Sequence, residues 1–409
     1  MIKLNSHPSG RHFLQIPGPT NVPDRVSRAM DYPTIDHRGP EFKLLGKKVL
    51  ADMAKIFKTT SNVIIYPASG TGAWEAALVN TLSPGDHILM VETGHFATLW
   101  KKLATKLALH TEFISGEWGR GVDADKIAAR LHDDPQHTIK AVCVVHNETS
   151  TAVTSNIAAV RRAIDSTGHP ALLMVDTISG LGSMEYRHDE WGVDVSISGS
   201  QKGLMLPPGL SFNAVSAKAI AASEHARLPR AYWAWDEIIA ANKNGVWPST
   251  PATTLLYGLS EACDMLFEEG LDNVFQRHQR HAEATRAAVR AWGLELLCQN
   301  PSEYSPALTA VKMPLVDGKS TNADTLRQII LENFNMSLGQ GLDKIAGTVF
   351  RIGHLGDFND LTLMGTLAGV EMGLELANIP FQKGGVLAAM QSLTQSAPSV
   401  ATQEHKKVA

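Results

Sequence analysis

The sequence predicts an α/β protein built on a mainly parallel sheet. Short apolar runs recur along the chain, and helix-length amphipathic stretches lie between several of them. Such alternation indicates crossover connections between parallel strands. A length of 409 residues suits one large domain and one smaller one. Hydrophobic residues make up 44% and charged residues 19%, a balance that can fill a sizeable core.

Seven strands are expected in the first part of the chain. They are predicted at residues 63–66, 87–91, 111–114, 141–145, 171–175, 193–198 and 211–215. Helical patterns between them lie at 72–81, 123–131 and 157–167. In an open sheet of this type ligands bind beyond the carboxyl ends of the strands, so functional side chains are expected there.

The pattern changes after about Pro251. Two long helices and a second α/β region are predicted, with helices at 253–269 and 271–291 and strands at 294–297, 308–311 and 348–352. On the second helix, His278 and His281 are expected on a solvated face. The chain is therefore divided into an N-terminal segment (1–20), a large domain (21–275), a small C-terminal domain (276–385) and a tail (386–409).

Charge and composition favour a small-molecule partner. The net charge is −4, from 37 basic and 41 acidic residues, so no strong field is available to gather nucleic acid or anionic lipid. Cys143, Cys263 and Cys298 lie far apart, which argues against a disulfide framework and a thiolate zinc site, and the histidines show no metal-ligand spacing. The N-terminus lacks a signal-peptide pattern and no apolar run is long enough to span a bilayer. We expect a cytoplasmic protein without a bound metal.

The strongest candidate for chemistry is Lys202, in the segment VDVSISGSQKGLMLPPG (193–209). A lysine at a strand end among small neighbours is partly desolvated, which lowers its proton affinity and makes its amine a nucleophile toward an aldehyde. Asp176 ends the buried run ALLMVD one crossover earlier, where a carboxylate needs a partner. In a pyridoxal-phosphate (PLP) site that partner is the protonated ring nitrogen. The ordinary alternatives are a surface lysine and an aspartate that caps a helix or turn.

Two further features suit an anionic small molecule. Ser69, Gly70 and Thr71 follow the run VIIYPA, and a strand, a glycine-rich turn and a helix N-terminus together form an anion cradle. The turn lacks the endings of a Walker A loop and of a dinucleotide fingerprint, so a simple tight turn is the alternative. Arg351 offers a planar fork that matches a carboxylate, although a surface salt bridge would use it equally well.

The sequence resembles the class V aminotransferases, and within them the serine–glyoxylate and alanine–glyoxylate aminotransferases. The resemblance covers nearly the whole chain. It is carried by IPGPTNVPDRVSRAM (16–30), TIDHRGPEF (34–42), PASGTGAWEAALVNTLSPGD (67–86), VVHNETSTAVTSN (144–156), HPALLMVD (169–176), DEWGVDVSISGSQKGLMLPPGL (189–210), WPSTPATTLLYGL (247–259) and FRIGHLGD (350–357).

The resemblance implies a fold-type I PLP enzyme that works as a homodimer with active sites at the subunit interface. It implies that Lys202 holds PLP as a Schiff base and that Asp176 pairs with the pyridine nitrogen. The other cofactor contacts it implies are the phosphate turn at Ser69, Gly70 and Thr71, an aromatic stack from Phe96, a hydroxyl from Thr149 or Ser150, Ile178 beside the ring, Gln201 near the phosphate, and Thr250 at the phosphate of the other subunit. For the substrate it implies Arg351 as a carboxylate clamp and the backbone of Pro17 and Gly18 nearby.

Three positions depart from the pattern of the family: Ser249 stands where relatives often carry tyrosine, Thr177 where glycine is usual, and Ala152 at another common glycine. The expected reaction is ping-pong transfer of an amino group from a small L-amino acid to glyoxylate, with serine as the first choice of donor and alanine or aspartate as alternatives. Two rivals stay open. One is a lyase of the cysteine-desulfurase type, which needs a reactive cysteine on a mobile loop, whereas Cys298 looks packed. The other is a non-enzymatic PLP- or nucleotide-binding module.

Overall fold

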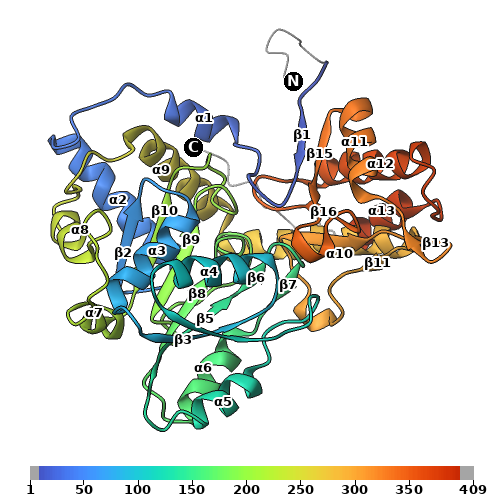
Figure 1. The fold of residues 1–409 in the computed structure, drawn as a ribbon. Coiled ribbons are helices and arrows are strands. Elements are labelled where there is room, and N and C mark those ends of the chain that lie inside the picture. Colours follow the sequence, from blue (N-terminus) through green and yellow to red (C-terminus); the bar gives the residue numbers. More distant parts are fainter. Residues whose placement is uncertain (1–8, 397–409) are drawn as a thin grey trace.

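A seven-stranded sheet forms the centre of the large domain in the computed structural model, which describes residues 9–396 (Figure 1). The strand order is β2-β10-β9-β8-β5-β3-β4. The strands are β2 (Asn62–Tyr66), β3 (His87–Val91), β4 (His110–Ile114), β5 (Ile139–Val145), β8 (Leu172–Asp176), β9 (Val195–Gly199) and β10 (Ser211–Val215). Strand β10 is antiparallel to both neighbours and the other pairs are parallel. The prediction of seven strands in a mainly parallel sheet is confirmed.

Helices cover this sheet (Figure 1). The helices of the large domain are α1 (Asp24–Met30), α2 (Pro40–Phe57), α3 (Gly70–Thr81), α4 (His95–Lys106), α5 (Ala124–His132), α6 (Ile157–Ser166), α7 (Ala217–Ser223), α8 (Trp235–Asn242) and α9 (Thr253–Glu269). The long helix α10 (Leu271–Ala291) follows α9 directly. Gly270 separates the two helices because its φ of +85° lies in the left-handed region, which glycine adopts readily.

The small domain contains a five-stranded sheet in the order β1-β15-β16-β12-β11. Its elements are β11 (Glu295–Leu296), η1 (Pro301–Glu303), β12 (Leu308–Lys312), β13 (Leu315–Val316), β14 (Lys319–Ser320), α11 (Ala323–Phe334), β15 (Met336–Gln340), η2 (Asp343–Ile345), β16 (Val349–Gly353), α12 (Asp360–Leu376) and α13 (Gly385–Gln395). The first strand, β1 (Phe13–Gln15), pairs in parallel with β15. No strand was predicted at residues 13–15.

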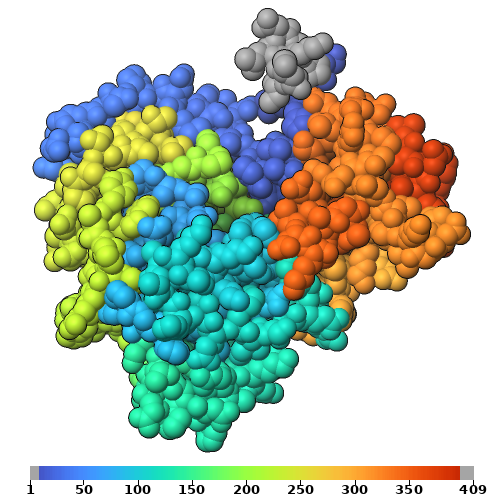
Figure 2. All heavy atoms as spheres, in the orientation of Figure 1, coloured from blue at the N-terminus to red at the C-terminus, as the bar shows by residue number. Residues whose placement is uncertain are grey.

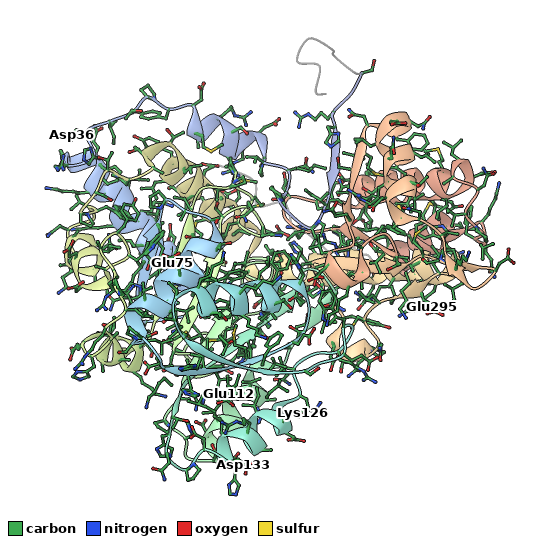
Figure 3. The ribbon with its side chains drawn as sticks, viewed as in Figure 1. Asp36, Glu75, Glu112, Lys126, Asp133 and Glu295 are labelled. Atoms are coloured by element: carbon green, nitrogen blue, oxygen red, sulfur yellow. The ribbon has the colours of Figure 1, made fainter. Side chains whose placement is uncertain are left out.

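The two domains have separate cores that meet along α10. One core gathers residues from Val26 to Val274, and a second gathers residues from Ala284 to Leu393. In the space-filling view the blue N-terminal residues run between the two domains, which lie to the left and right (Figure 2). Charged side chains lie on the outside: Asp36, Lys126, Asp133 and Glu295 are all exposed (Figure 3).

Two expectations from the sequence are wrong. The tail was predicted to begin at residue 386, but α13 extends from Gly385 to Gln395 and buries Ala389 and Leu393 in the small-domain core. His278 and His281 were expected on a solvated face, yet both are fully buried. The His278 ring hydrogen-bonds to the backbone of Val274 and Gly356, and the His281 ring to Asp360. The face of α10 that carries these histidines therefore packs against the protein and does not face solvent.

No helix within residues 9–396 is both long and apolar enough to cross a membrane. The same residues contain no group of three or more histidine, cysteine or acidic side chains placed to hold a metal ion.

Candidate active site

The candidate residues meet at the carboxyl end of the large sheet, where the sequence predicted them. Asp176 is the last residue of β8, and Lys202 follows the neighbouring strand β9 after a short turn. Helix α3 begins at Gly70, just after β2. From the small domain, β16 contributes Arg351. The parallel pairing of β5, β8 and β9 brings these loops to one edge because their carboxyl ends point the same way.

Lys202 is buried, with 7% of its surface exposed, and its Nζ donates a hydrogen bond to the Pro17 carbonyl. No carboxylate forms a salt bridge with it among the described residues. Burial lowers the pKa of Lys202 to about 7, and the positive charge of Arg351 acts in the same direction. A substantial fraction of this amine is therefore uncharged at neutral pH, as a nucleophile requires.

The N-terminal segment packs closely against the lysine loop. A Cβ atom on Gly18, whose φ is +95°, would lie 2.3 Å from the Lys202 Cδ, so only glycine allows this approach. Thr20 also holds this loop, because its N–H donates to the Gln201 carbonyl at 3.1 Å and its hydroxyl donates to the Lys202 carbonyl at 3.2 Å. These contacts place residues 17–20 of the predicted N-terminal segment at the site, and residues 1–8 lie outside the described residues.

Asp176 is 3% exposed and accepts one hydrogen bond on each carboxylate oxygen. The Ile178 N–H donates to Oδ1 at 2.7 Å, and the Trp74 indole N–H donates to Oδ2 at 3.1 Å. Burial raises the pKa of Asp176 to about 7, against the lowering effect of the Ile178 N–H. A buried carboxylate of this kind is stabilised by a cationic partner.

The turn at Ser69, Gly70 and Thr71 forms the N-terminus of α3. Ser69 occupies the N-cap position without a side-chain hydrogen bond to the helix, and the first N–H groups of a helix have no intrahelical partner. A Cβ on Gly70 would lie 2.3 Å from the Ile178 Cδ1, so glycine is needed for this side chain to pack there. Nearby, the Oε1 atom of Gln201 is buried and has no partner among the described residues.

Glu148 connects the loop after β5 to helix α4. It lies in the short hairpin of β6 (Asn147–Glu148) and β7 (Val153–Thr154) and is fully buried. Its carboxylate accepts from the Phe96 N–H at 3.3 Å, the Ala97 N–H at 3.1 Å, and the Ser150 N–H and hydroxyl at 3.0 and 2.7 Å. The His95 N–H donates to the Ser150 hydroxyl at 2.9 Å. The N-cap residue of α4 is Gly94, which has no side chain to cap the helix. The side chains of Glu148 and Ser150, from the loop after β5, accept the first N–H groups of α4 instead.

Arg351 is 6% exposed and bonds only to backbone carbonyls among the described residues. Its Nε donates to Gln340 at 2.8 Å and its Nη1 to Thr149 at 2.7 Å. Burial lowers the pKa of Arg351 to about 10, while Glu148 opposes that shift. A buried guanidinium without a carboxylate partner favours binding of an anion.

The structure brings together most of the predicted residues. Among these, Phe96 lies in the first turn of α4 and is partly buried. The exception is Thr250, which is exposed in the loop before α9 and forms no hydrogen bond with the site among the described residues. Its predicted role, at the phosphate of another subunit, stays a prediction.

The three departures from the family pattern have different local settings. Ala152 has a φ of +59°, in the left-handed region where a glycine is unstrained. Thr177 is buried, and its hydroxyl donates to the Ile197 carbonyl on β9 at 2.9 Å. Ser249 is exposed beside Thr250. The backbone strain at Ala152 falls in the turn that follows Thr149 and Ser150.

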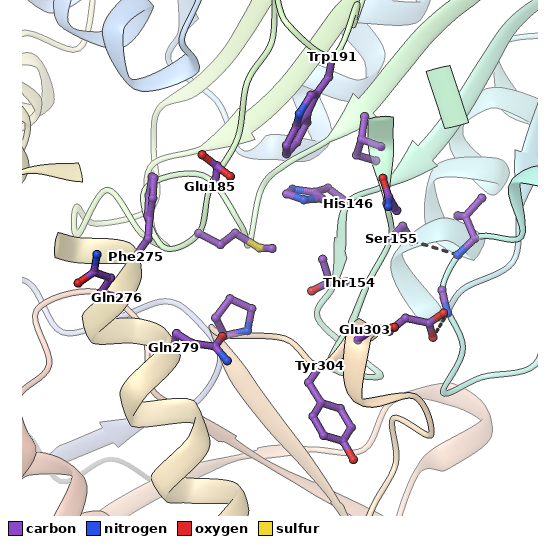
Figure 4. A pocket seen from close by; sticks show the side chains of 17 residues that line it. His146, Thr154, Ser155, Glu185, Trp191, Phe275, Gln276, Gln279, Glu303 and Tyr304 are labelled. Carbon is purple, nitrogen blue, oxygen red and sulfur yellow. Dashed lines mark hydrogen bonds between the residues drawn. The ribbon is translucent and has the colours of Figure 1, made fainter. Parts of the chain in front are cut away.

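A separate cleft of about 750 Å³ lies away from these residues (Figure 4). It is lined by segments of both domains, among them His146, Trp191, Phe275 and Tyr304. It contains two glutamates and no lysine or arginine. A phosphate or carboxylate would meet no cation there, so this cleft is not the anion site that the sequence predicts.

Two residues that form hydrogen bonds at the candidate site, Trp74 and Glu148, were not predicted from the sequence. They were included only within the segments 67–86 and 144–156 that carry the family resemblance. Their place in these segments was the only available signal. Their roles depend on hydrogen bonds to residues more than 50 positions away, which no local pattern encodes.

Comparisons with known proteins agree with this geometry. A family model described as "Aminotransferase class-V" matches residues 12–332. The serine–glyoxylate aminotransferase of Methylorubrum extorquens is 47% identical over 395 residues, covering 95% of this chain and 97% of that protein. The L-aspartate–glyoxylate aminotransferase of Paracoccus denitrificans is 44% identical, covering 92% and 94%. The crystal structure of ureidoglycine–glyoxylate aminotransferase from Bacillus subtilis has a TM-score of 0.86 at 25% identity and covers 95% of this chain and 100% of that one.

Proposed function

The chain belongs to the class-V aminotransferase family, and on that premise we propose that it transfers the amino group of a small L-amino acid to glyoxylate, giving glycine. Serine is the proposed donor. One observation carries the proposal: a buried amine, Lys202, and a buried guanidinium, Arg351, share one site without a carboxylate partner for either among the described residues. The two cationic side chains are close together, because the charge of Arg351 contributes to the lowered pKa of Lys202. The Lys202 amine bonds to the Pro17 carbonyl, and a Cβ on Gly339 would lie 2.7 Å from the Pro17 Cδ and 3.0 Å from the Arg351 Cβ.

PLP is the cofactor of this proposal, and the residues present fit it. Its aldehyde suits the partly uncharged amine of Lys202, and its ring nitrogen suits the buried carboxylate of Asp176. Its phosphate suits the N-terminus of α3 at Ser69, Gly70 and Thr71. The buried, unpartnered Oε1 of Gln201 marks a place where a further polar partner is needed.

When bound, PLP supplies an electron-withdrawing ring that stabilises negative charge developing at the donor's Cα. The chain's own residues do the rest. Lys202 holds the cofactor and then moves the proton of the donor's Cα, a task for which a pKa near 7 is suited because the amine can both accept and release a proton at neutral pH. Arg351 binds the substrate carboxylate and orients the Cα–H bond. Asp176 holds the proton at the ring nitrogen.

The hydrogen bonds favour Thr149 over Ser150 as the hydroxyl that meets the cofactor ring. The Ser150 hydroxyl already donates to Glu148 and accepts from the His95 N–H. The Thr149 hydroxyl forms no hydrogen bond within residues 9–396, while the Thr149 carbonyl accepts one from Arg351. Thr149 is therefore the residue whose hydroxyl is free to bind a ligand.

A homodimer with shared sites is part of the proposal. Thr250 is exposed in a single chain, whereas the resemblance assigns it to a phosphate in the other subunit. A residue that contacts a neighbouring subunit must be exposed on its own chain, as Thr250 is.

A lyase of the cysteine-desulfurase type is disfavoured by the cysteines. Cys143, Cys263 and Cys298 are all buried. Burial raises the pKa of the Cys298 thiol to about 11, and burial raises the pKa of the other two as well. Each is thus held as an unreactive thiol rather than a nucleophilic thiolate. The aspartate donor stays as the alternative, because one relative at 44% identity is named for it.

The test is a donor panel on the purified protein loaded with PLP. Serine, alanine and aspartate are each supplied with glyoxylate or pyruvate, and glycine or alanine formation is measured by mass spectrometry. We expect the highest kcat/KM for serine with glyoxylate. Glycine formation from aspartate alone would replace the donor, and sulfide release from cysteine without any amino transfer would replace the reaction.

A further inference from the structure

The carboxylate of Asp176 has a buried indole as its hydrogen-bond donor. The Trp74 Nε1–H donates to Oδ2 at 3.1 Å, and the Ile178 N–H donates to Oδ1 at 2.7 Å. Each oxygen therefore accepts one hydrogen bond from the protein and retains a lone pair. An indole N–H can only donate, so it interacts favourably with the ionised carboxylate and cannot accept a proton from the neutral acid.

The position of Trp74 is set by two helices. It lies on α3, one turn after the anion cradle at Ser69, Gly70 and Thr71, so the helix that begins at the cradle also carries this donor. Its ring stacks on Trp100 of α4, with centroids 5.8 Å apart and planes 11° from parallel. Both rings are at most 2% exposed. This packing holds the direction of the Trp74 N–H.

Burial works against the ionised form of Asp176, and the Trp74 N–H works for it. A neutral acid at this position would not keep a proton on a pyridine nitrogen, whereas a carboxylate would. Hydrogen bonds to a charged group are about twice as strong as those between neutral groups. The indole thus favours the ionised form of the carboxylate, which the proposed reaction needs.

We infer that Trp74 is a positioning residue for Asp176: its N–H keeps the carboxylate ionised and aimed at the ring nitrogen of a bound pyridine cofactor. The inference rests on the proposed function, because it assigns a role to Asp176 toward PLP. It goes further by naming the residue that maintains the charge of that acid.

Trp100 offers a matched control. It belongs to the same stacked pair and is equally buried, but its Nε1 has no hydrogen-bond partner among the described residues. Trp74→Phe and Trp100→Phe each remove one indole from one cluster. Only the first removes a donor from Asp176, so a packing effect appears in both variants and a charge effect in one.

The experiment measures cofactor affinity of the apo-protein by isothermal titration calorimetry. Two probes are used: PLP, and an analogue with carbon in place of the ring nitrogen. For Trp74→Phe we expect PLP binding to weaken about tenfold or more, and binding of the analogue to change less than twofold. For Trp100→Phe we expect changes below about threefold with both probes. An equal loss for both probes in Trp74→Phe, or a similar PLP loss in Trp100→Phe, would overturn the inference.

A second substitution guards against a folding defect. Trp74 is replaced by the tryptophan isostere that carries sulfur in place of the N–H group, which keeps the ring shape and the stack on Trp100. We expect the same selective loss of PLP affinity as in Trp74→Phe, with the native fold retained by circular dichroism, and unaltered PLP affinity would overturn the inference. Failure of the proposed function looks different, because the unmodified protein would then fail to bind PLP or would bind both probes equally.

Discussion

The Arg351 guanidinium donates to the carbonyl of Thr149 at 2.7 Å and thereby joins the small domain to the loop that follows β5. Strand β16 carries the arginine and the large domain carries the threonine, 202 positions apart in the sequence. The proposed substrate clamp and the proposed cofactor hydroxyl are consequently parts of one hydrogen-bonded unit. A movement of the small domain would alter both.

Lys202→Ala should remove amino-transfer activity while leaving the fold intact. The substitution deletes the amine that both holds the cofactor and moves the Cα proton, and general acid–base groups of this kind contribute about 10²–10⁴ in rate. Borohydride reduction followed by peptide mass spectrometry should detect a PLP adduct at this lysine in the unmodified protein and none in the variant. Lys126→Ala, on an exposed position of α5, serves as the control. An adduct on another lysine would exclude Lys202 as the attachment point.

Arg351→Lys should lower kcat/KM for donor and acceptor about 100-fold, mostly through KM. A lysine cannot reproduce the planar fork that binds a carboxylate in two places, and it would also lose one of the bonds to the Gln340 and Thr149 carbonyls. Arg327→Lys, another arginine of the small domain that donates to a strand carbonyl, should change kcat/KM little. Unchanged KM values in Arg351→Lys would show that substrate carboxylates bind elsewhere.

Gly18→Ala should reduce activity far more than it reduces stability. The new Cβ would meet the Lys202 side chain at 2.3 Å and displace it. Gly85→Ala is the matched control, because Gly85 also has a positive φ, of +83°, but a Cβ there would meet nothing within 4 Å. Each substitution carries the backbone cost of about 1–2 kcal/mol for a left-handed residue. Comparing turnover with the free energy of unfolding separates the two effects, and equal activity in both variants would refute the steric argument.

Glu148→Gln should destabilise the protein by about 2 kcal/mol and weaken PLP binding. The variant keeps one acceptor oxygen but turns an amide group toward the N–H donors of Phe96, Ala97 and Ser150. Urea unfolding and calorimetric titration with PLP are the measurements. Glu75→Gln, on α3, is the control because within residues 9–396 its carboxylate accepts a hydrogen bond only from the Trp233 side chain. Stability equal to that of the unmodified protein would mean that the cap on α4 contributes nothing.

Because of His278, the free energy of unfolding should fall as the pH is lowered. Burial lowers its pKa to about 3, below the unfolded value of about 6.5. The folded state therefore excludes a proton that the unfolded state binds, so its contribution is fully present above about pH 6.5 and is lost as the pH falls toward 3. The slope is about 1.4 kcal/mol per pH unit in that window. Urea unfolding of His278→Gln between pH 6.5 and 4.5 should show a shallower pH dependence than the unmodified protein, and an equal slope would contradict the assignment.

The bonds of His278 explain why its neutral form is required. The Nδ1 group lies 2.7 Å from the Val274 carbonyl, and Nε2 accepts the Gly356 N–H at 3.1 Å. A proton on Nε2 would therefore remove an acceptor that the loop after β16 uses. The substitution tests the fold of this loop as well as the titration.

Much of the architecture could be predicted from local patterns. The seven strands of the large sheet were expected at nearly their observed places, and helices α9 and α10 begin and end where their periodicity indicated. The helix ends could be predicted because their signals are local: Gly270 interrupts the helix, and the apolar spacing extends over a few residues. Lys202 and Asp176 could be found for the same reason, since a reactive or charged residue directly after a buried strand must lie at the edge of the sheet.

Contacts between distant segments could not be predicted in this way. The pairing of β1 with β15 links residues more than 300 positions apart, and nothing in the N-terminal segment specifies that partner. The burial of His278 and His281 depends on how the small domain packs against α10. Periodicity identifies a helix, but the choice of its buried face depends on the neighbouring elements.

The sequence by itself determined the seven strands of the large sheet, helices such as α9 and α10, and the amine, acid and guanidinium proposed for the chemistry, because each has a local signature in residue type and spacing. Only the tertiary structure decided how these groups are held. It showed that Trp74 donates to Asp176, that Glu148 caps α4 from another loop, and that Ser150 is already bonded while Thr149 is not. The physical reason is that a hydrogen bond depends on the distance and direction between two atoms, which folding sets for residues far apart in the chain.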